Sequence, residues 1–275
     1  MRAAVLVFLA ILALGGARAQ AERPQTLTWG AYSVTVTPRP EKDYDKTATA
    51  VIKQGSKTLV TLRDWSIEAS LKALRPGGPP ELLLTAYSGG AHCCTTYYAF
   101  TQDSGSLQNL FILDAGNYGA NFTDLNGDGT LEAVFGSDTF AYYDYSFAAS
   151  PATLYVLGCD GVRFADLTRR YAYVPGQEAA RALKNLTRPL GKDEDPNETR
   201  RSALVGYYSN AVVAGDGAAA EQILNRQVFP AQPALKGWFA AHRSELLSLL
   251  YDDPGGRLSI SDARTLPEKK DPDQP

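Results

Sequence analysis

The sequence is poor in the residues that most enzyme centres require. Its 275 residues include only two histidines and three cysteines. It contains no Gly-x-Ser-x-Gly elbow, no His-Glu-x-x-His helix and no glycine-rich phosphate loop, which excludes the enzyme classes that depend on those motifs. Two histidines also leave little room for a His-based triad or a transition-metal centre. A pair of glycosidase carboxylates stays open, because acidic residues are plentiful and the sequence does not give their separation in space.

A basic block and a second long apolar segment are also missing. The formal net charge is −3 at pH 7, and this argues against a nucleic-acid partner. The apolar run at residues 3–14 follows Arg2 and precedes Ala17-Arg18-Ala19. This pattern predicts a signal peptide at residues 1–19 that is cleaved near Ala19, and the run is too short to span a membrane. We therefore expect a periplasmic or secreted protein with no integral membrane span.

The composition changes near Gly176. Thr, Tyr, Val and Gly are frequent before this point, whereas Ala, Leu, Glu and Arg dominate after it. The change predicts an α+β fold, with an N-terminal antiparallel β domain at residues 20–175 and a helical region at residues 176–263. The charged, proline-rich tail at residues 264–275 is typical of disorder.

Hydrophobic periodicity predicts the elements within these two parts. Alternation predicts strands at residues 29–37, 47–53, 57–62, 65–71, 82–87, 95–100, 110–113 and 131–135. Helices are expected at residues 177–186, 198–213 and 218–226, the last with Asp216 as N-cap. A final helix carries a single apolar stripe that includes His242: Leu235, Trp238, Phe239, His242, Leu246, Leu249 and Leu250. We expect Trp29, Trp65 and His242 to be packed rather than to form a site.

One run in the chain has a residue spacing that indicates a specific chemistry. It reads Asp124-Leu-Asn-Gly-Asp-Gly-Thr-Leu-Glu132. Oxygen-bearing side chains stand at its positions 1, 3, 5 and 9, and the backbone carbonyl of Thr130 is available at position 7. Ca²⁺ prefers six to eight hard oxygen ligands, several of them carboxylates. The sequence therefore predicts a calcium site with the ligands Asp124, Asn126, Asp128, Thr130 and Glu132.

Two other interpretations of this run exist. An EF-hand loop requires a bidentate Glu at position 12, where this chain has Phe135, so the run is not an EF-hand. It could also be an acidic Asn-Gly or Asp-Gly turn without a metal. Three acids within nine residues would repel one another in the absence of a cation, which favours the metal.

The run, followed by Ala133-Val-Phe135, resembles the FG-GAP/VCBS repeat, the calcium-loop repeat of integrin-type β-propellers. The resemblance implies propeller-blade-like repeats in which the acidic loop joins two strands. A weaker copy lies 51 residues upstream, where Gly78 to Leu84 aligns with Gly129 to Phe135. Its ligand positions hold Ala73, Arg75 and Gly77, so we expect one calcium site. The segment Tyr87 to Cys94 is similar to a stretch of some exported bacterial FG-GAP-like proteins, a group without a known activity.

The three cysteines leave several possibilities open. In an oxidising compartment Cys93 or Cys94 could form a disulfide with Cys159, and a vicinal Cys93–Cys94 bond would be strained. Free buried thiols, or a reactive thiol or soft metal site that includes His92, are the alternatives. The cluster Tyr142, Tyr143 and Tyr145 presents a similar choice between strand packing and a surface that stacks on a sugar.

These observations favour an exported, non-catalytic, calcium-stabilised protein that binds an unknown protein or carbohydrate partner or acts structurally. A hydrolase or thiol-dependent enzyme that uses the Ser88–Cys94 loop is an alternative. A second alternative is an envelope inhibitor or scaffold that acts through the helical region.

Overall fold

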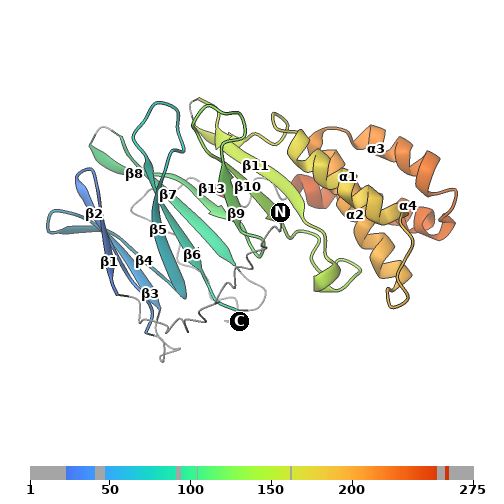
Figure 1. Cartoon of the computed structure of the whole chain (residues 1–275), viewed down its shortest axis with the longest axis horizontal. Coiled ribbons are helices and arrows are strands. Elements are labelled where there is room, and N and C mark those ends of the chain that lie inside the picture. The colour runs from blue at the N-terminus through green and yellow to red at the C-terminus, as the bar shows by residue number, and fades with distance from the viewer. Residues whose placement is uncertain are drawn as a thin grey trace, which may run out of the picture.

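The computed structural model describes residues 23–40, 47–90, 94–103, 105–161, 163–252 and 258–259. Three antiparallel β-sheets are followed by a helical region, which confirms the predicted α+β class. Figure 1 shows the sheets side by side, from blue to yellow-green, with the helices at one end of the molecule. The predicted signal peptide at residues 1–19 and the tail at residues 264–275 lie outside the described residues.

Each sheet is built on a meander of four consecutive strands. Sheet 1 has the order β1-β2-β3-β4, sheet 2 the order β13-β8-β7-β6-β5, and sheet 3 the order β12-β11-β10-β9. The bounds are β1 Gln25–Trp29, β2 Tyr32–Thr37, β3 Ala48–Gln54, β4 Lys57–Asp64, β5 Ser66–Lys72, β6 Glu81–Tyr87, β7 Thr95–Asp103, β8 Ser106–Asp114, β9 Ala120–Thr123, β10 Glu132–Ser137, β11 Thr153–Cys159, β12 Phe164–Asp166 and β13 Leu258–Ser259.

The strand predicted at residues 29–37 is confirmed over residues 32–37, which form β2, but Trp29 belongs to a separate preceding strand. β1 ends at Trp29 and β2 begins at Tyr32, with Gly30 at φ 57° in the turn between them. A Cβ atom at Gly30 would meet the flexible end of the Gln102 side chain, which can move away, so it is the positive φ that favours glycine here. The Trp29 side chain is buried, as expected, and its Nε1 donates to the Pro80 carbonyl at 2.8 Å.

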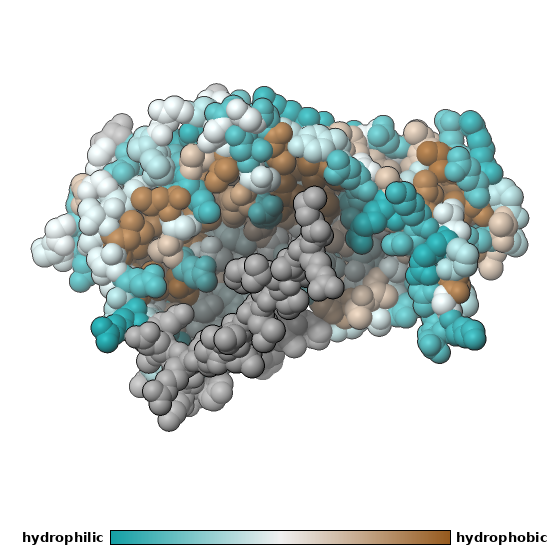
Figure 2. Space-filling view, viewed as in Figure 1, coloured by the Kyte–Doolittle hydropathy of each residue, from teal (hydrophilic) through white to brown (hydrophobic). Residues whose placement is uncertain are grey.

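Sheet 2 is buried on both faces, which explains its continuous apolar runs. Leu82 and Leu84 of β6 pack against sheet 1, whereas Leu83 between them packs against sheet 3. In β7, Tyr98 and Phe100 face sheet 1. Side chains of successive residues point to opposite faces of a strand, so one run contributes to two cores. Figure 2 shows apolar residues gathered along the sheets on the viewed face.

The helical region packs against the outer face of sheet 3. The helices are α1 Tyr173–Thr187, α2 Pro196–Ala214, α3 Gly217–Ile223 and α4 Pro233–Asp252, with a 3-10 turn η1 at Phe147–Ala149 and a π-helical turn η2 at Leu224–Val228. Leu235, Phe239, Leu246 and Leu250 of the predicted stripe are buried. His242 packs on Trp238 with ring centroids 4.5 Å apart, as predicted. Among the described residues, no helix has the length and apolar character needed to cross a membrane.

The N-cap of α2 supports a prediction with an internal control. Asp195 Oδ1 accepts from the N–H groups of Asn197 at 2.8 Å and Glu198 at 2.9 Å, whereas the side chain of Asp216, at the N-cap of α3, makes no capping bond. Asp195→Ala should lower the free energy of unfolding by about 1 kcal/mol. Asp216→Ala should change it by less than about 0.5 kcal/mol. Urea unfolding followed by circular dichroism measures both, and equal losses would contradict the prediction.

The predicted extent of the helical region, residues 176–263, is wrong at its C-terminal end. Leu258 and Ser259 form β13, which pairs antiparallel with Leu113 and Ile112 of β8. The four-strand meander leaves β8 at the edge of sheet 2, with backbone groups that can take a further strand. Helical periodicity ends before this segment, and two residues are too few for a strand to be predicted from their pattern.

Candidate metal site

The acidic run forms the connection between β9 and β10 of sheet 3, where the Tyr173 hydroxyl at the start of α1 lies 3.4 Å from the Leu125 carbonyl. Asp124 is its hub. Its Oδ1 accepts from the N–H groups of Gly127 at 2.7 Å and of Asn126 and Asp128 at 3.2 Å, and its Oδ2 accepts from Gly129 at 2.8 Å. These donors, Gly129 foremost, lower the pKa of Asp124. The backbone of the run therefore stabilises the ionised form of its first carboxylate.

Asp128 and Asn126 are joined to the same turn. Asp128 Oδ1 accepts from the Thr130 N–H at 2.7 Å, and its Oδ2 accepts from Asn126 Nδ2 at 2.8 Å. Asn126 Oδ1 in turn accepts from the Asp128 N–H at 2.9 Å. The Thr130 N–H is the main cause of the lowered pKa of Asp128. The side chains at loop positions 1, 3 and 5 thus belong to one hydrogen-bonded turn.

Glu132 has a different environment. Its side chain is buried, with 4% of its surface exposed, and Oε2 accepts from the Leu125 N–H at 2.8 Å while Oε1 accepts from the Tyr171 hydroxyl at 2.8 Å. Burial and the contact with Glu132 raise the pKa of Tyr171 to about 12. Asn126 Nδ2 lies 3.2 Å from the same hydroxyl. Tyr171 therefore connects the buried acid to the exposed turn.

The structure brings together only part of the predicted ligand set. Asp124, Asn126 and Asp128 share one turn, and Thr130 is buried beside it. Among the described residues, however, no group of three His, Cys, Asp or Glu side chains is placed to hold a metal ion. Glu132 is directed to Leu125 and Tyr171 instead. The calcium assignment therefore stays a prediction, and Tyr171, which no spacing in the sequence indicated, belongs to the site.

The upstream copy has the same buried glutamate and backbone hydrogen bond as the downstream unit, but its neighbouring side chains carry a different charge. Glu81 stands 51 residues before Glu132, at the start of β6 as Glu132 starts β10, and is 1% exposed. Its Oε2 accepts from the Leu74 N–H at 3.0 Å, and Leu74 stands 51 residues before Leu125. Each unit thus places a buried Glu on the amide of a Leu seven residues earlier.

The two units differ in what neutralises this carboxylate. Arg75 Nε donates to Glu81 Oε1 at 2.7 Å, and its guanidinium also pairs with Asp103 at 2.8 Å. The position that corresponds to Arg75 in the downstream unit holds Asn126. Within the described part of the chain, no ion pair joins Glu132 to an Arg, Lys or His side chain. A buried carboxylate without a cation is costly.

The second predicted site, the Ser88–Cys94 loop, is described in part. Cys94 is disulfide-bonded, and its N–H lies 3.1 Å from Ser88 Oγ. Cys159, half-buried at the end of β11, is a free cysteine. The pairing of Cys159 with Cys93 or Cys94 is therefore wrong, because Cys159 forms no disulfide. His92 and Cys93 lie outside the described residues. The two predictions that depend on them, a soft metal site and a vicinal Cys93–Cys94 disulfide, therefore also fall outside the described residues.

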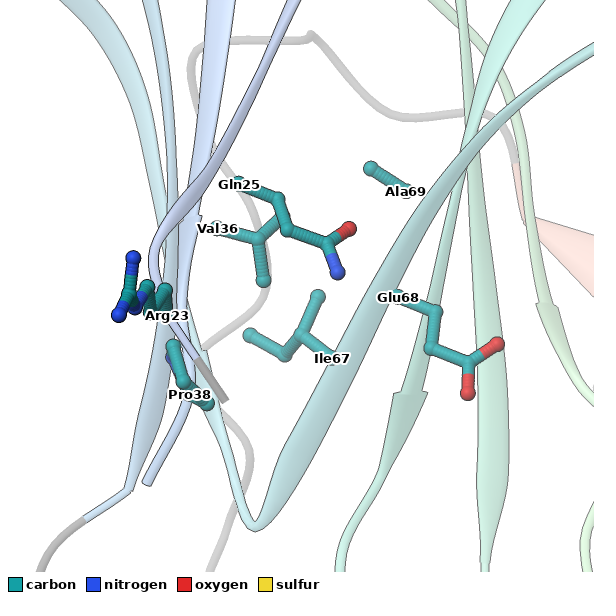
Figure 3. A pocket seen from close by; sticks show the side chains of 7 residues that line it. All are labelled: Arg23, Gln25, Val36, Pro38, Ile67, Glu68 and Ala69. Atoms are coloured by element: carbon teal, nitrogen blue, oxygen red, sulfur yellow. The ribbon is translucent and has the colours of Figure 1, made fainter. Parts of the chain in front are cut away.

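A cleft of ≈ 220 Å³ lies between the edges of sheets 1 and 2. Figure 3 shows Val36, Ile67 and the amide of Gln25 directed into the space, whereas the carboxylate of Glu68 points away from them. The remaining lining residues are Arg23, Pro38 and Ala69. This cleft contains one carboxylic acid and neither histidine nor cysteine, so it lacks the paired groups of acid–base or nucleophilic catalysis.

Comparison with known proteins gives partial relatives. No family model and no solved structure matches the chain. A probable thylakoid lumen protein of Synechocystis sp. is 27% identical over 143 residues, which cover 50% of this chain and 40% of the relative. An uncharacterized protein of Sinorhizobium fredii is 28% identical over 96 residues, which cover 34% of this chain and 15% of the relative. The matches thus span less than half of each relative.

Proposed function

We propose that this chain is an exported, non-catalytic binding or structural protein in which Ca²⁺ stabilises sheet 3. The observation that carries the proposal is the charge difference between the two repeat units. The upstream unit neutralises its buried acid, Glu81, with the guanidinium of Arg75. The downstream unit has Asn126 in place of that arginine and adds Asp124 and Asp128. A bound divalent cation would supply the missing positive charge.

The chemistry of the donors suits Ca²⁺. Asp124, Asn126 and Asp128 offer hard oxygens from one turn, and the carbonyl of Thr130 would complete their side of the ion. Gly127 and Gly129, at φ 78° and 84°, allow the backbone to fold back on itself. The amide of Asn126 would need to turn so that its oxygen faces the ion. Glu132 would become a ligand if its carboxylate left the Tyr171 hydroxyl. Otherwise it would attract the ion electrostatically without coordinating it.

Two further features fit this role. The predicted signal peptide at residues 1–19 and the relative named as a probable thylakoid lumen protein both favour export. The three four-stranded meanders stand side by side as propeller blades do, in keeping with FG-GAP/VCBS-like repeats. An unknown protein or carbohydrate partner would bind on this scaffold. The disulfide at Cys94 disfavours the thiol-enzyme alternative, because it removes a nucleophilic thiolate from that loop.

Calorimetric titration of the purified chain with Ca²⁺ tests the metal site. We expect one ion per chain and loss of binding in Asp124→Ala, because Asp124 organises the turn through its four backbone contacts. Asp160→Ala is a control, since Asp160 lies in the turn after β11 and outside the loop. Absence of binding at millimolar Ca²⁺ would refute the calcium site.

A further inference from the structure

Tyr171 joins two of the proposed calcium ligands through one hydroxyl group. Its O–H donates to Oε1 of Glu132 at 2.8 Å, and Nδ2 of Asn126 donates to the same hydroxyl oxygen at 3.2 Å. A tyrosine hydroxyl has a single proton. Because that proton lies on Glu132, the oxygen can only accept from Asn126. The hydroxyl therefore selects the amide orientation in which Asn126 presents its NH₂ group, and not its oxygen, to Tyr171.

This orientation of the Asn126 amide is one that a bound ion does not use. Nδ2 also donates to Asp128 Oδ2 at 2.8 Å, so the NH₂ group stands between Tyr171 and a proposed carboxylate ligand. A cation binds the oxygen of an amide, because the NH₂ group is a donor and offers no lone pair. Ca²⁺ must therefore displace the NH₂ group from Tyr171 before it can use the Asn126 oxygen.

The hydroxyl of Tyr171 cannot follow the ligands to new positions. The Tyr171 side chain is 5% exposed and packs with Val156 and Leu167. Its backbone N–H donates to the Leu167 carbonyl at 3.0 Å, and its own carbonyl accepts from Val174 at 2.9 Å. Close packing and these bonds fix the ring in place. A ligand that moves toward an ion thus loses its hydrogen bond to Tyr171.

The buried carboxylate of Glu132 would attract an ion more strongly without this hydroxyl. Its Oε2 accepts from the Leu125 N–H at 2.8 Å, and its Cγ lies beside Gly158, where an added Cβ would be 3.0 Å away. These contacts keep Glu132 buried if the hydroxyl is removed. Within the described residues, Tyr171 is the one donor to Oε1. An ionised oxygen that is buried without a donor is costly, and a nearby cation lowers that cost.

We propose that Tyr171 sets the calcium affinity of the loop by holding Asn126 and Glu132 in their ion-free arrangement. The inference rests on the proposed calcium site and names the residue that opposes its occupation. A residue behind metal ligands usually orients them for the ion, so that its loss weakens binding. Tyr171 acts in the opposite direction, because its hydrogen bonds stabilise an arrangement that the ion has to break.

Tyr171→Phe tests this role, since it removes the hydroxyl and keeps the ring. Calorimetric titration of the whole chain should give a Kd for Ca²⁺ about tenfold lower than that of the parent, the effect of one hydrogen bond. Tyr173→Phe is the matched control, because the Tyr173 hydroxyl donates at 3.4 Å to the Leu125 carbonyl, a backbone group instead of a ligand side chain. Its Kd should stay within about twofold of the parent value.

Thermal unfolding separates this role from a simple loss of stability. In EDTA, Tyr171→Phe should unfold at a lower temperature than the parent, because a buried carboxylate loses its donor. In excess Ca²⁺ the two proteins should unfold at the same temperature, since tighter binding offsets the loss. A hydroxyl with only a structural role would cause the same loss in both solutions.

A measurement on the parent alone does not depend on how the variant folds. In EDTA, NMR should show a nuclear Overhauser contact between the Asn126 side-chain amide protons and the Tyr171 ring, and Ca²⁺ should remove it. If the parent binds Ca²⁺, a Kd that Tyr171→Phe leaves unchanged or raises, or a contact that persists in Ca²⁺, would overturn this inference and leave the metal site intact. If neither protein bound Ca²⁺ at millimolar concentration, both proposals would be wrong.

Discussion

Arg75→Met should lower the free energy of unfolding by about 3–5 kcal/mol, the usual cost of removing one partner from a buried ion pair. Glu81 is 1% exposed, and one of its oxygens depends on Arg75. Without the guanidinium, the carboxylate would stay in the core with the Leu74 amide as its one donor among the described residues. Urea unfolding of the parent and the variant measures the difference.

Two controls separate the buried charge from the loss of side-chain packing. Arg75→Met/Glu81→Gln should recover most of the stability, because a neutral amide oxygen can still accept from Leu74. Arg181→Met removes an exposed pair with Glu178 and should cost less than about 1 kcal/mol. If the double variant were as unstable as Arg75→Met, an uncompensated carboxylate would not be the cause.

Calcium at a hundredfold excess over its Kd should raise the free energy of unfolding by about 2.7 kcal/mol relative to EDTA, since the ion binds the folded state. For a chain of this size the unfolding temperature would rise by roughly 5–10 °C. Asp128→Ala should abolish the rise, because it removes a proposed ligand. Mg²⁺ should have a smaller effect, since it demands a tighter octahedral set of ligands.

Asn126→Arg tests the same calcium proposal by adding a positive side chain instead of removing a ligand. It places an arginine where the upstream unit has Arg75, beside the equivalent buried acid Glu132. The variant should be more stable than the parent in EDTA and should no longer respond to Ca²⁺. Equal calcium responses in the parent, Asp128→Ala and Asn126→Arg would show that the ion acts elsewhere on the chain.

Local patterns predicted much of the fold. Alternation and turn residues located the β3–β4 hairpin, and the stripe of α4 predicted its buried face. Such patterns succeed because neighbouring residues on one face respond to the same environment. They failed at Gly30, where a short turn divides one apparent strand, and at β13, whose two residues gain their structure only by pairing with β8.

Patterns in the sequence alone predicted the acidic run, its weaker copy 51 residues upstream and a β part followed by helices, because residues close together in the chain carry each pattern. Which polar and charged side chains contact one another depends on the tertiary structure. Tyr171 reaches Glu132 across 39 positions, and Arg75 reaches Asp103 across 28. Spacing along the chain cannot reveal such contacts, since packing of the sheets and helices brings these side chains together.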